Sequence, residues 1–422
     1  MMTGSMPAEI GNLTQLSYLS IAGSDFQGNI PKELINLKKL TTLNLLNNEL
    51  TGSLPTELAH LTSLSFLKVS FNHFNMSIPT EFGNLVKLVY FNSESNNLTG
   101  SLPSELGLLT RLENCSVYNN HVTGTIPTEF GNLAQLSVFS TFTNNITGPI
   151  PSELGRLTKL TYLAIHENQL NSTIPAELGN LAQLVSLFAY VNDLTGSLPS
   201  ELGLLTKLTV LSAYNNHITG TIPTEFGNLA PLSEFDVFTN NITGPIPSEL
   251  GRLTSLTYLD MDDNQLTSTI PTELGSLAQL VSFYANENDL TGSLPSELGQ
   301  LTWLIIFSTA NNQLNSSVPF QYGKLQQLLI LDVHRNNLTN SLPSELGLLN
   351  KLTYLDLSVN EFNNTIPSQI GLMSHLQLFN VSLNQLTGTI PSALGMLKSL
   401  SKYLCCCCYI DLFSGFSFYC KG

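Results

Sequence analysis

Leucines recur at fixed positions within a unit of 24 residues along this chain. In one unit, Leu43 and Leu45 alternate with outward residues, a period of two that is typical of a short β-strand. Later in the same unit, Leu58, Leu61 and Leu64 recur at every third position, which predicts a short helical turn on the opposite side. Each unit is therefore predicted to contain one strand and one short helical turn.

The period is kept over almost the whole chain. A proline recurs every 24 residues from Pro7 to Pro391, 17 times, without an insertion or deletion. A unit this short cannot bury its own apolar face, so successive copies must stack and share one core. We therefore predict one α/β repeat solenoid of about 16–17 repeats over residues 1–404.

An asparagine follows each predicted strand in fifteen consecutive units. Its amide can bond backbone groups of its own and adjacent turns, which would otherwise be buried without a partner. We predict that this asparagine column fastens the turns together. The column comprises Asn48, Asn72, Asn96, Asn120, Asn144, Asn168, Asn192, Asn216, Asn240, Asn264, Asn288, Asn312, Asn336, Asn360 and Asn384.

The consensus LxxLxLxxNxLTGxIPxxLGxL resembles the plant-type leucine-rich repeat of receptor-like kinases, receptor-like proteins and polygalacturonase inhibitors. The resemblance implies a right-handed superhelix with a parallel sheet on the concave face and short helical or 3-10 turns on the convex face. It also implies a peptide or protein partner on the concave face and an extracellular or cell-surface location. The family's cysteine-paired N-terminal cap, kinase domain and membrane span are not recognised, so we expect a fragment or an incomplete sequence.

One outward column of the predicted sheet is unusually aromatic, and acidic residues follow it. Outward strand positions have no role in the core, so unusual composition there indicates a binding surface. With strands about 4.8 Å apart, six rings would extend over roughly 24 Å. The predicted partner site comprises Tyr118, Phe142, His166, Tyr190, Tyr214 and Phe238 with Glu234, Asp236, Asp260, Asp262, Asp263 and Glu287.

This surface suits a peptide or protein segment with apolar and basic residues, and a glycan stacking on the rings is a further possibility. The alternative is that the aromatic residues only cover their neighbours on the sheet. Residues 97–192 and 193–288 align at an offset of 96, so repetition of a residue can reflect copying of whole blocks rather than use.

Composition and motifs exclude several other functions. Acidic residues outnumber basic ones by 31 to 16, which usually argues against nucleic-acid binding. Fourteen of the acids, however, are glutamates at one repeat position two residues after the proline, so net charge says little about the partner. The sequence contains no Walker, HExxH, GxSxG or kinase motif. We therefore expect no enzyme activity and no cofactor. We also expect no metal site, including at the seven histidines. Eleven Asn-x-Ser/Thr sequons would permit glycosylation.

Five of the six cysteines crowd residues 405–422, an apolar tail that we predict to lie outside the fold. The tail could be a truncated membrane span, a palmitoylated anchor, a cysteine metal site or translated non-coding sequence. Contact with a membrane is expected only through a missing or truncated segment. The leading functional hypothesis is a non-catalytic recognition module in signalling or defence; the alternatives are a secreted inhibitor of a wall-degrading enzyme and a structural or adhesive surface protein.

Overall fold

The computed structural model describes residues 2–405, which divide into two compact units between Ile218 and Thr219. The single solenoid expected over residues 1–404 stays a prediction. The tail lies outside the described residues except for Cys405, which is exposed and free.

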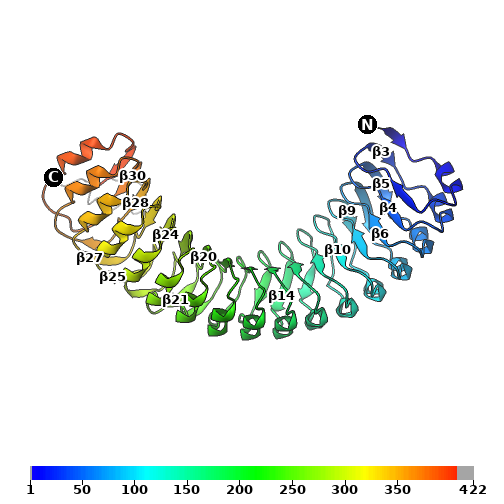
Figure 1. Cartoon of the computed structure of the whole chain (residues 1–422), viewed down its shortest axis with the longest axis horizontal. Coiled ribbons are helices and arrows are strands. Elements are labelled where there is room, and N and C mark those ends of the chain that lie inside the picture. Colours follow the sequence, from blue (N-terminus) through cyan, green and yellow to red (C-terminus); the bar gives the residue numbers. More distant parts are fainter. Residues whose placement is uncertain (1, 406–422) are drawn as a thin grey trace, which may run out of the picture. The chain divides into compact units, whose positions relative to one another are not determined.

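A ladder of parallel strands, here called the main ladder, forms one side of each unit (Figure 1). Paired strands are offset by one repeat, so that Leu43 pairs with Leu67 and Leu331 with Leu355. In the first unit the main ladder comprises β2 (Tyr18–Ser20), β4 (Thr42–Asn44), β6 (Phe66–Lys68), β8 (Tyr90–Asn92), β10 (Asn114–Ser116), β11 (Val138–Ser140), β13 (Tyr162–Ala164), β15 (Ser186–Phe188) and β17 (Val210–Ser212). In the second unit it comprises β18 (Glu234–Asp236), β20 (Tyr258–Asp260), β22 (Ser282–Tyr284), β24 (Ile306–Ser308), β26 (Ile330–Asp332), β28 (Tyr354–Asp356), β30 (Leu378–Asn380) and β31 (Lys402–Leu404).

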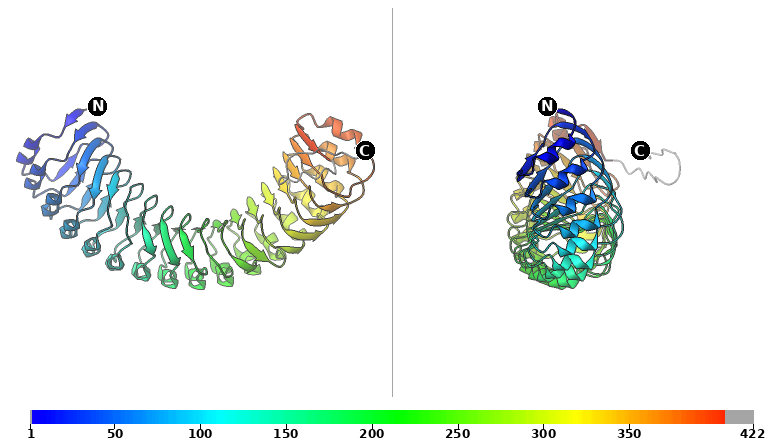
Figure 2. Two further views of the ribbon diagram at one scale, coloured as in Figure 1. Left: turned by 180° about the vertical axis from the view of Figure 1, so that it is seen from behind. Right: turned by 90° about the vertical axis from the view of Figure 1, so that its right-hand side faces the viewer.

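Short 3-10 helices cover the opposite side of each unit (Figure 2). Each helix begins directly after a repeat proline, whose fixed φ suits the extended residue before a helical turn. The helices of the first unit are η1 (Ala8–Asn12), η2 (Lys32–Asn36), η3 (Thr56–His60), η4 (Thr80–Asn84), η5 (Ser104–Leu108), η6 (Thr128–Asn132), η7 (Ser152–Arg156), η8 (Ala176–Asn180) and η9 (Ser200–Leu204). Those of the second unit are η10 (Thr224–Asn228), η11 (Ser248–Arg252), η12 (Thr272–Ser276), η13 (Ser296–Gln300), η14 (Phe320–Lys324), η15 (Ser344–Leu348), η16 (Ser368–Leu372) and η17 (Ser392–Met396).

Many repeats have a second, shorter strand between the asparagine turn and the next proline. These strands pair in parallel with those of neighbouring repeats and form shorter ladders. In the first unit they comprise β1 (Thr3–Ser5), β3 (Asp25–Gly28), β5 (Glu49–Ser53), β7 (His73–Ser77), β9 (Asn97–Thr99), β12 (Thr147–Pro149), β14 (Gln169–Thr173) and β16 (Asp193–Thr195). In the second unit they comprise β19 (Thr243–Pro245), β21 (Gln265–Thr267), β23 (Thr291–Ser293), β25 (Gln313–Ser316), β27 (Asn337–Asn340) and β29 (Glu361–Phe362). The predicted repeat fold of parallel strands and short helical turns is thus confirmed within each unit.

The asparagine column joins neighbouring turns through its side-chain amides. The Nδ2 group of Asn72 donates to the carbonyl oxygens of Leu45, Val69 and Ser70 at 2.9, 3.1 and 3.1 Å. Its Oδ1 atom accepts the backbone N–H of Leu50 at 3.0 Å. The same pattern recurs along both units. Each amide therefore satisfies backbone groups of its own turn and of the preceding turn.

Large and small side chains alternate in the core beneath the main ladder. Phe283 is buried above Ala285, and Phe307 is buried above Thr309. The rings of Phe283 and Phe307 stack with their centroids 5.5 Å apart. The pairing of a large with a small residue keeps the volume of the shared core nearly constant.

Candidate functional site

Five aromatic side chains of the first unit form a continuous stack, here called the ring column. Each ring comes two residues after a main-ladder strand, at β10, β11, β13, β15 and β17, so the repeat spacing places the rings one above another. Successive centroids lie 4.2, 4.3, 4.1 and 4.4 Å apart, with interplanar angles between 7° and 23°. The ring column comprises Tyr118, Phe142, His166, Tyr190 and Tyr214.

This stacking decides which parts of the rings a ligand could contact. Because neighbouring rings lie almost parallel at van der Waals distance, the inner rings cover one another's faces. A sugar ring that needs an aromatic face could therefore not stack on the inner rings. The ring edges and the tyrosine hydroxyl groups remain the groups that can meet a ligand, which favours a peptide over a glycan.

His166 lies at the centre of the ring column with one ring nitrogen unsatisfied. The residue is only 6% exposed, and its Nδ1 atom has no hydrogen-bond partner. Burial lowers the pKa of His166 to about 4, and the nearby Glu167 only partly opposes this effect. The imidazole is therefore neutral near neutral pH, and its Nδ1 atom is buried without a hydrogen-bond partner.

Glu94 occupies the same outward column one turn before Tyr118. Its side chain is buried, and its Oε2 atom has no partner. Burial raises the pKa of Tyr118, and the charge of Glu94 raises it further. The sequence-based prediction missed Glu94, although reading the aromatic column one turn further back would have found it. An unpaired carboxylate oxygen at this end of the rings suits a cationic group.

The rest of the predicted site lies in the second unit, where β18 and β20 position most of it. Phe238 follows β18 and is half-buried. Asp236 and Asp260 are buried and Glu234 and Asp262 half-buried, whereas Asp263 and Glu287 are exposed, so the six predicted acids do not form one uniform surface.

Hydrogen bonds hold the buried acids in place. The hydroxyl group of Tyr258 donates to Oδ2 of Asp260 at 2.8 Å. The backbone N–H and Nδ2 groups of Asn286 donate to the two carboxylate oxygens of Asp262 at 2.5 and 2.7 Å. Burial raises the pKa of Asp260. Burial, followed by repulsion from Asp260, raises the pKa of Asp262 to about 7.

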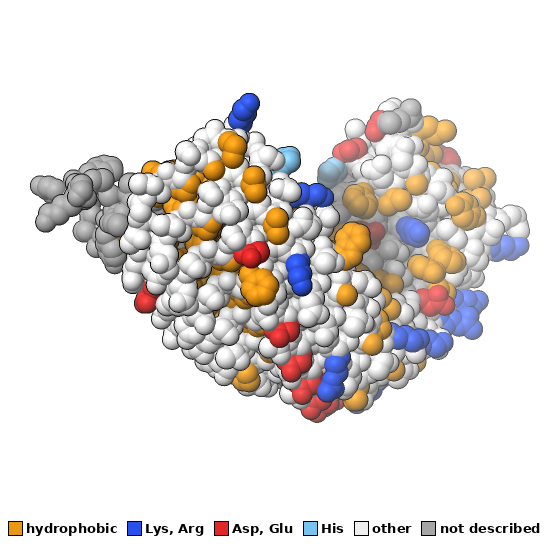
Figure 3. All heavy atoms as spheres, turned by 60° about the vertical axis from the view of Figure 1, so that its left-hand side comes forward, with side chains coloured by type: hydrophobic (Ala, Val, Ile, Leu, Met, Phe, Trp, Pro, Cys, Tyr) orange, Lys and Arg blue, Asp and Glu red, His pale blue; other side chains and the backbone are white. Residues whose placement is uncertain are grey.

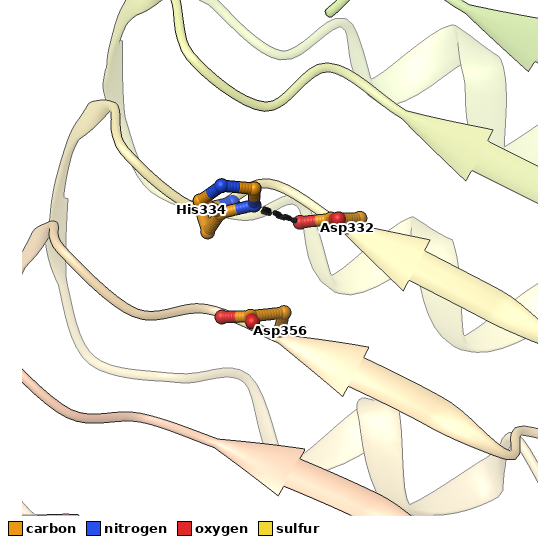
Figure 4. A group of neighbouring side chains, drawn as sticks. All are labelled: Asp332, His334 and Asp356. Atoms are coloured by element: carbon orange, nitrogen blue, oxygen red, sulfur yellow. Dashed lines mark hydrogen bonds and ion pairs between the residues drawn. The ribbon is translucent and has the colours of Figure 1, made fainter. Parts of the chain in front are cut away.

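A second cluster, absent from the sequence-based prediction, joins Asp332, His334 and Asp356 (Figure 4). Asp332 ends β26, Asp356 ends β28, and the two residues are paired across the ladder. The Nδ1 atom of His334 lies 2.7 Å from Oδ1 of Asp332. The sequence contained a signal for this cluster. His334 comes two residues after Asp332 and therefore shares its face of the strand, and Asp356 comes one repeat later.

Charge is mixed on the face that Figure 3 displays. Basic side chains there lie mostly apart from one another among uncharged and acidic ones.

Two family models match the sequence. A leucine-rich repeat region matches residues 4–123, and a Leucine Rich Repeat model matches residues 207–229, 255–277, 351–373 and 375–397. Among solved structures, this chain is similar to the plant peptide hormone receptor RGFR1 in complex with RGF2. The two sequences are 31% identical, the TM-score is 0.73, and the match covers 95% of this chain and 76% of that chain. The chain belongs to the leucine-rich repeat family.

Other leucine-rich repeat structures resemble it comparably. The ectodomain of the Arabidopsis receptor kinase HAESA, in complex with an N-terminally extended IDA peptide hormone, is 29% identical, with a TM-score of 0.78 over 96% of this chain and 72% of that chain. A leucine-rich repeat protein of Leptospira interrogans is 27% identical, with a TM-score of 0.70 over 96% of this chain and all of that chain. No curated protein sequence gives a significant match.

The leucine-rich repeats contain only short helices in the part of the chain described. Between residues 2 and 405, none has both the length and the apolar character needed to cross a membrane.

Proposed function

We propose that this leucine-rich repeat chain is the ligand-recognition module of a receptor-like protein and holds an extended peptide along the ring column. The observation that carries the proposal is the continuous stack of five rings on the outward side of the main ladder, with the carboxyl group of Glu94 one turn before it. The receptor ectodomains RGFR1 and HAESA, whose structures contain peptide hormones, support the same class of ligand.

The chemistry of the site defines the peptide. A lysine or arginine would pair with Glu94 at one end of the column, since a buried carboxylate with a free oxygen favours a charge-assisted hydrogen bond. Apolar or aromatic side chains would then lie against the ring edges.

The module is proposed to act outside the cell or at its surface and to have no catalytic activity. The matched receptor ectodomains support this proposal. The matched peptide-binding receptor structures give the secreted-inhibitor and structural alternatives no better support.

A peptide-binding measurement tests the proposal. Fluorescence anisotropy would be recorded with a library of labelled 12-residue peptides in which one lysine or arginine precedes aromatic or branched residues, and with matched peptides carrying glutamate at the basic position. We expect the basic peptides to bind and the glutamate series to bind at least tenfold more weakly.

Variants of the chain assign that binding to the ring column. The double change Tyr190→Ala and Tyr214→Ala and the single change Glu94→Gln should each weaken binding at least tenfold while the far-UV spectrum is retained. Phe66→Ala is the control, because Phe66 stacks on Tyr90 at 4.9 Å outside the ring column. Equal binding by the double variant would refute the proposal, as would the absence of any preference for the basic peptides.

A further inference from the structure

We infer that Asp332, His334 and Asp356 form a binding site for one divalent transition-metal ion, with zinc as the best-matched ion. The inference does not depend on the proposed peptide site, since all three residues lie in the second unit. It rests on three side chains that the fold brings to one point on the main-ladder face.

The backbone positions these residues without a dedicated loop. Asp332 and Asp356 are directly paired on the adjacent parallel strands β26 and β28, so their side chains leave the same face of the ladder. His334 follows Asp332 by two residues, and its ring turns back toward that carboxylate (Figure 4). One donor atom from each residue lies within 4.8 Å of the other two.

Neighbouring groups hold the carboxylates in place. Asp356 is only 7% exposed, and its Oδ1 atom accepts the backbone N–H and the hydroxyl group of Ser358 at 2.9 and 2.6 Å. Its Oδ2 atom accepts Nδ2 of Asn380 at 3.0 Å. Oδ1 of Asp332 accepts the backbone N–H of His334 at 3.2 Å. Such outer-shell bonds orient ligand atoms before a metal arrives.

The charge at this point favours a cation. Two carboxylates lie side by side on adjacent strands, and in residues 2–405 neither forms an ion pair with a lysine or arginine. The only ionic partner of Asp332 in those residues is His334 itself. A metal ion would replace the hydrogen bond between Nδ1 of His334 and Asp332 and would neutralise both carboxylates.

The donor set selects the ion. One imidazole nitrogen with two carboxylate oxygens suits zinc at distances of about 2.0–2.2 Å, whereas magnesium and calcium prefer oxygen ligands alone. Ligand atoms around such an ion lie roughly 3–3.5 Å apart, so the 2.7 Å contact between His334 and Asp332 would need to open slightly. Three protein ligands leave a fourth position for water or for a donor group of a partner.

Isothermal titration with zinc chloride tests the inference in the full-length chain. The five tail cysteines would first be changed to serine, since thiolates also bind zinc: Cys405, Cys406, Cys407, Cys408 and Cys420. In this background we expect one equivalent of zinc to bind and a tenfold excess of magnesium not to displace it. Cobalt should give the visible absorption of an ion with nitrogen and oxygen ligands and no thiolate band.

Variants identify the ligands. His334→Ala and Asp356→Asn should each weaken zinc binding at least tenfold, and Asp332→Asn should do so with little change of shape. His73→Ala is the matched control, because His73 also contacts a carboxylate, that of Glu49 at 2.7 Å, without a second carboxylate in the cluster. A thermal melt without metal would verify that each variant is folded.

Three results would each overturn the inference. The first is that the background chain does not bind zinc, and the second is that the folded His334→Ala and Asp332→Asn variants bind zinc with unchanged affinity. The third is that His73→Ala loses as much zinc affinity as the ligand variants do.

Discussion

Gly179 packs directly against the backbone of Glu201 in the next turn. A Cβ atom added at Gly179 would lie 2.4 Å from the carbonyl oxygen of Glu201, which is much closer than such atoms approach. The absence of a side chain at this position therefore allows η8 and η9 to stack at the spacing of the solenoid. Most repeats have glycine at the equivalent position, with the same close approach to the next turn.

The change Gly179→Ala should destabilise the protein by about 1–3 kcal/mol, because the two turns must separate or distort to admit the methyl group. Chemical denaturation with urea would measure the loss. Gly395→Ala is the matched control, since a Cβ atom at Gly395 meets no atom within 4 Å among the described residues. Equal effects of the two changes would contradict this explanation of the glycine column.

The change Thr309→Val should stabilise the protein by about 1 kcal/mol. Thr309 is fully buried, and its hydroxyl oxygen has no hydrogen-bond partner. Valine has nearly the same shape and removes the cost of burying that group. Thermal melting should show a higher midpoint for Thr309→Val and no gain for the exposed control Thr302→Val. A lower midpoint for Thr309→Val would mean that the hydroxyl group has a favourable role that the structure does not reveal.

Ser268→Gly should also be stabilising, by up to about 1 kcal/mol. Ser268 has a φ of +68°, in the left-handed region where a side chain is strained, and its equivalent in the next repeat, Gly292, has a φ of +74°. The reverse change, Gly292→Ser, should destabilise the protein, because it adds this strain and places a Cβ atom 2.6 Å from Cγ2 of Thr269. Denaturation midpoints of the two variants should therefore move in opposite directions; a shift in the same direction would rule out backbone strain as the cause.

Protonation of Asp262 should make stability depend on pH. Burial, with Asp260 as the second cause, raises the pKa of Asp262 in the folded protein to about 7, whereas an unfolded aspartate titrates near 4. Between these values the folded state binds more protons than the unfolded state, so this group makes stability fall as pH rises from about 4 to 7.

The change Asp262→Asn should remove this contribution, since the amide cannot ionise and its Oδ1 atom can still accept the backbone N–H of Asn286. Melting temperatures between pH 4 and pH 8 should fall less steeply in the variant than in the parent chain. Asp263→Asn, at the exposed neighbouring residue, should leave the slope unchanged. A parent-like slope in Asp262→Asn would show that Asp262 does not titrate in this range.

The sequence determined the repeat fold because the interactions that create it are local or act between adjacent copies. The alternation of Leu43 and Leu45 specifies a strand, and the proline at a fixed interval specifies where each helical turn begins. The pairing of Phe283 with the smaller Ala285 was also readable, because volume in a shared core depends on residue size alone.

Only the tertiary structure decided which atoms remain unpaired and which residues meet. Whether Nδ1 of His166 or Oε2 of Glu94 has a partner depends on side-chain rotamers and on solvent exclusion by neighbouring turns, which no spacing rule specifies. The contact of His334 with Asp332, beside Asp356, likewise needs strand pairing and ring orientation together. Hydrogen bonds and metal sites require atoms placed to within a fraction of an ångström, whereas a repeat pattern places only residues.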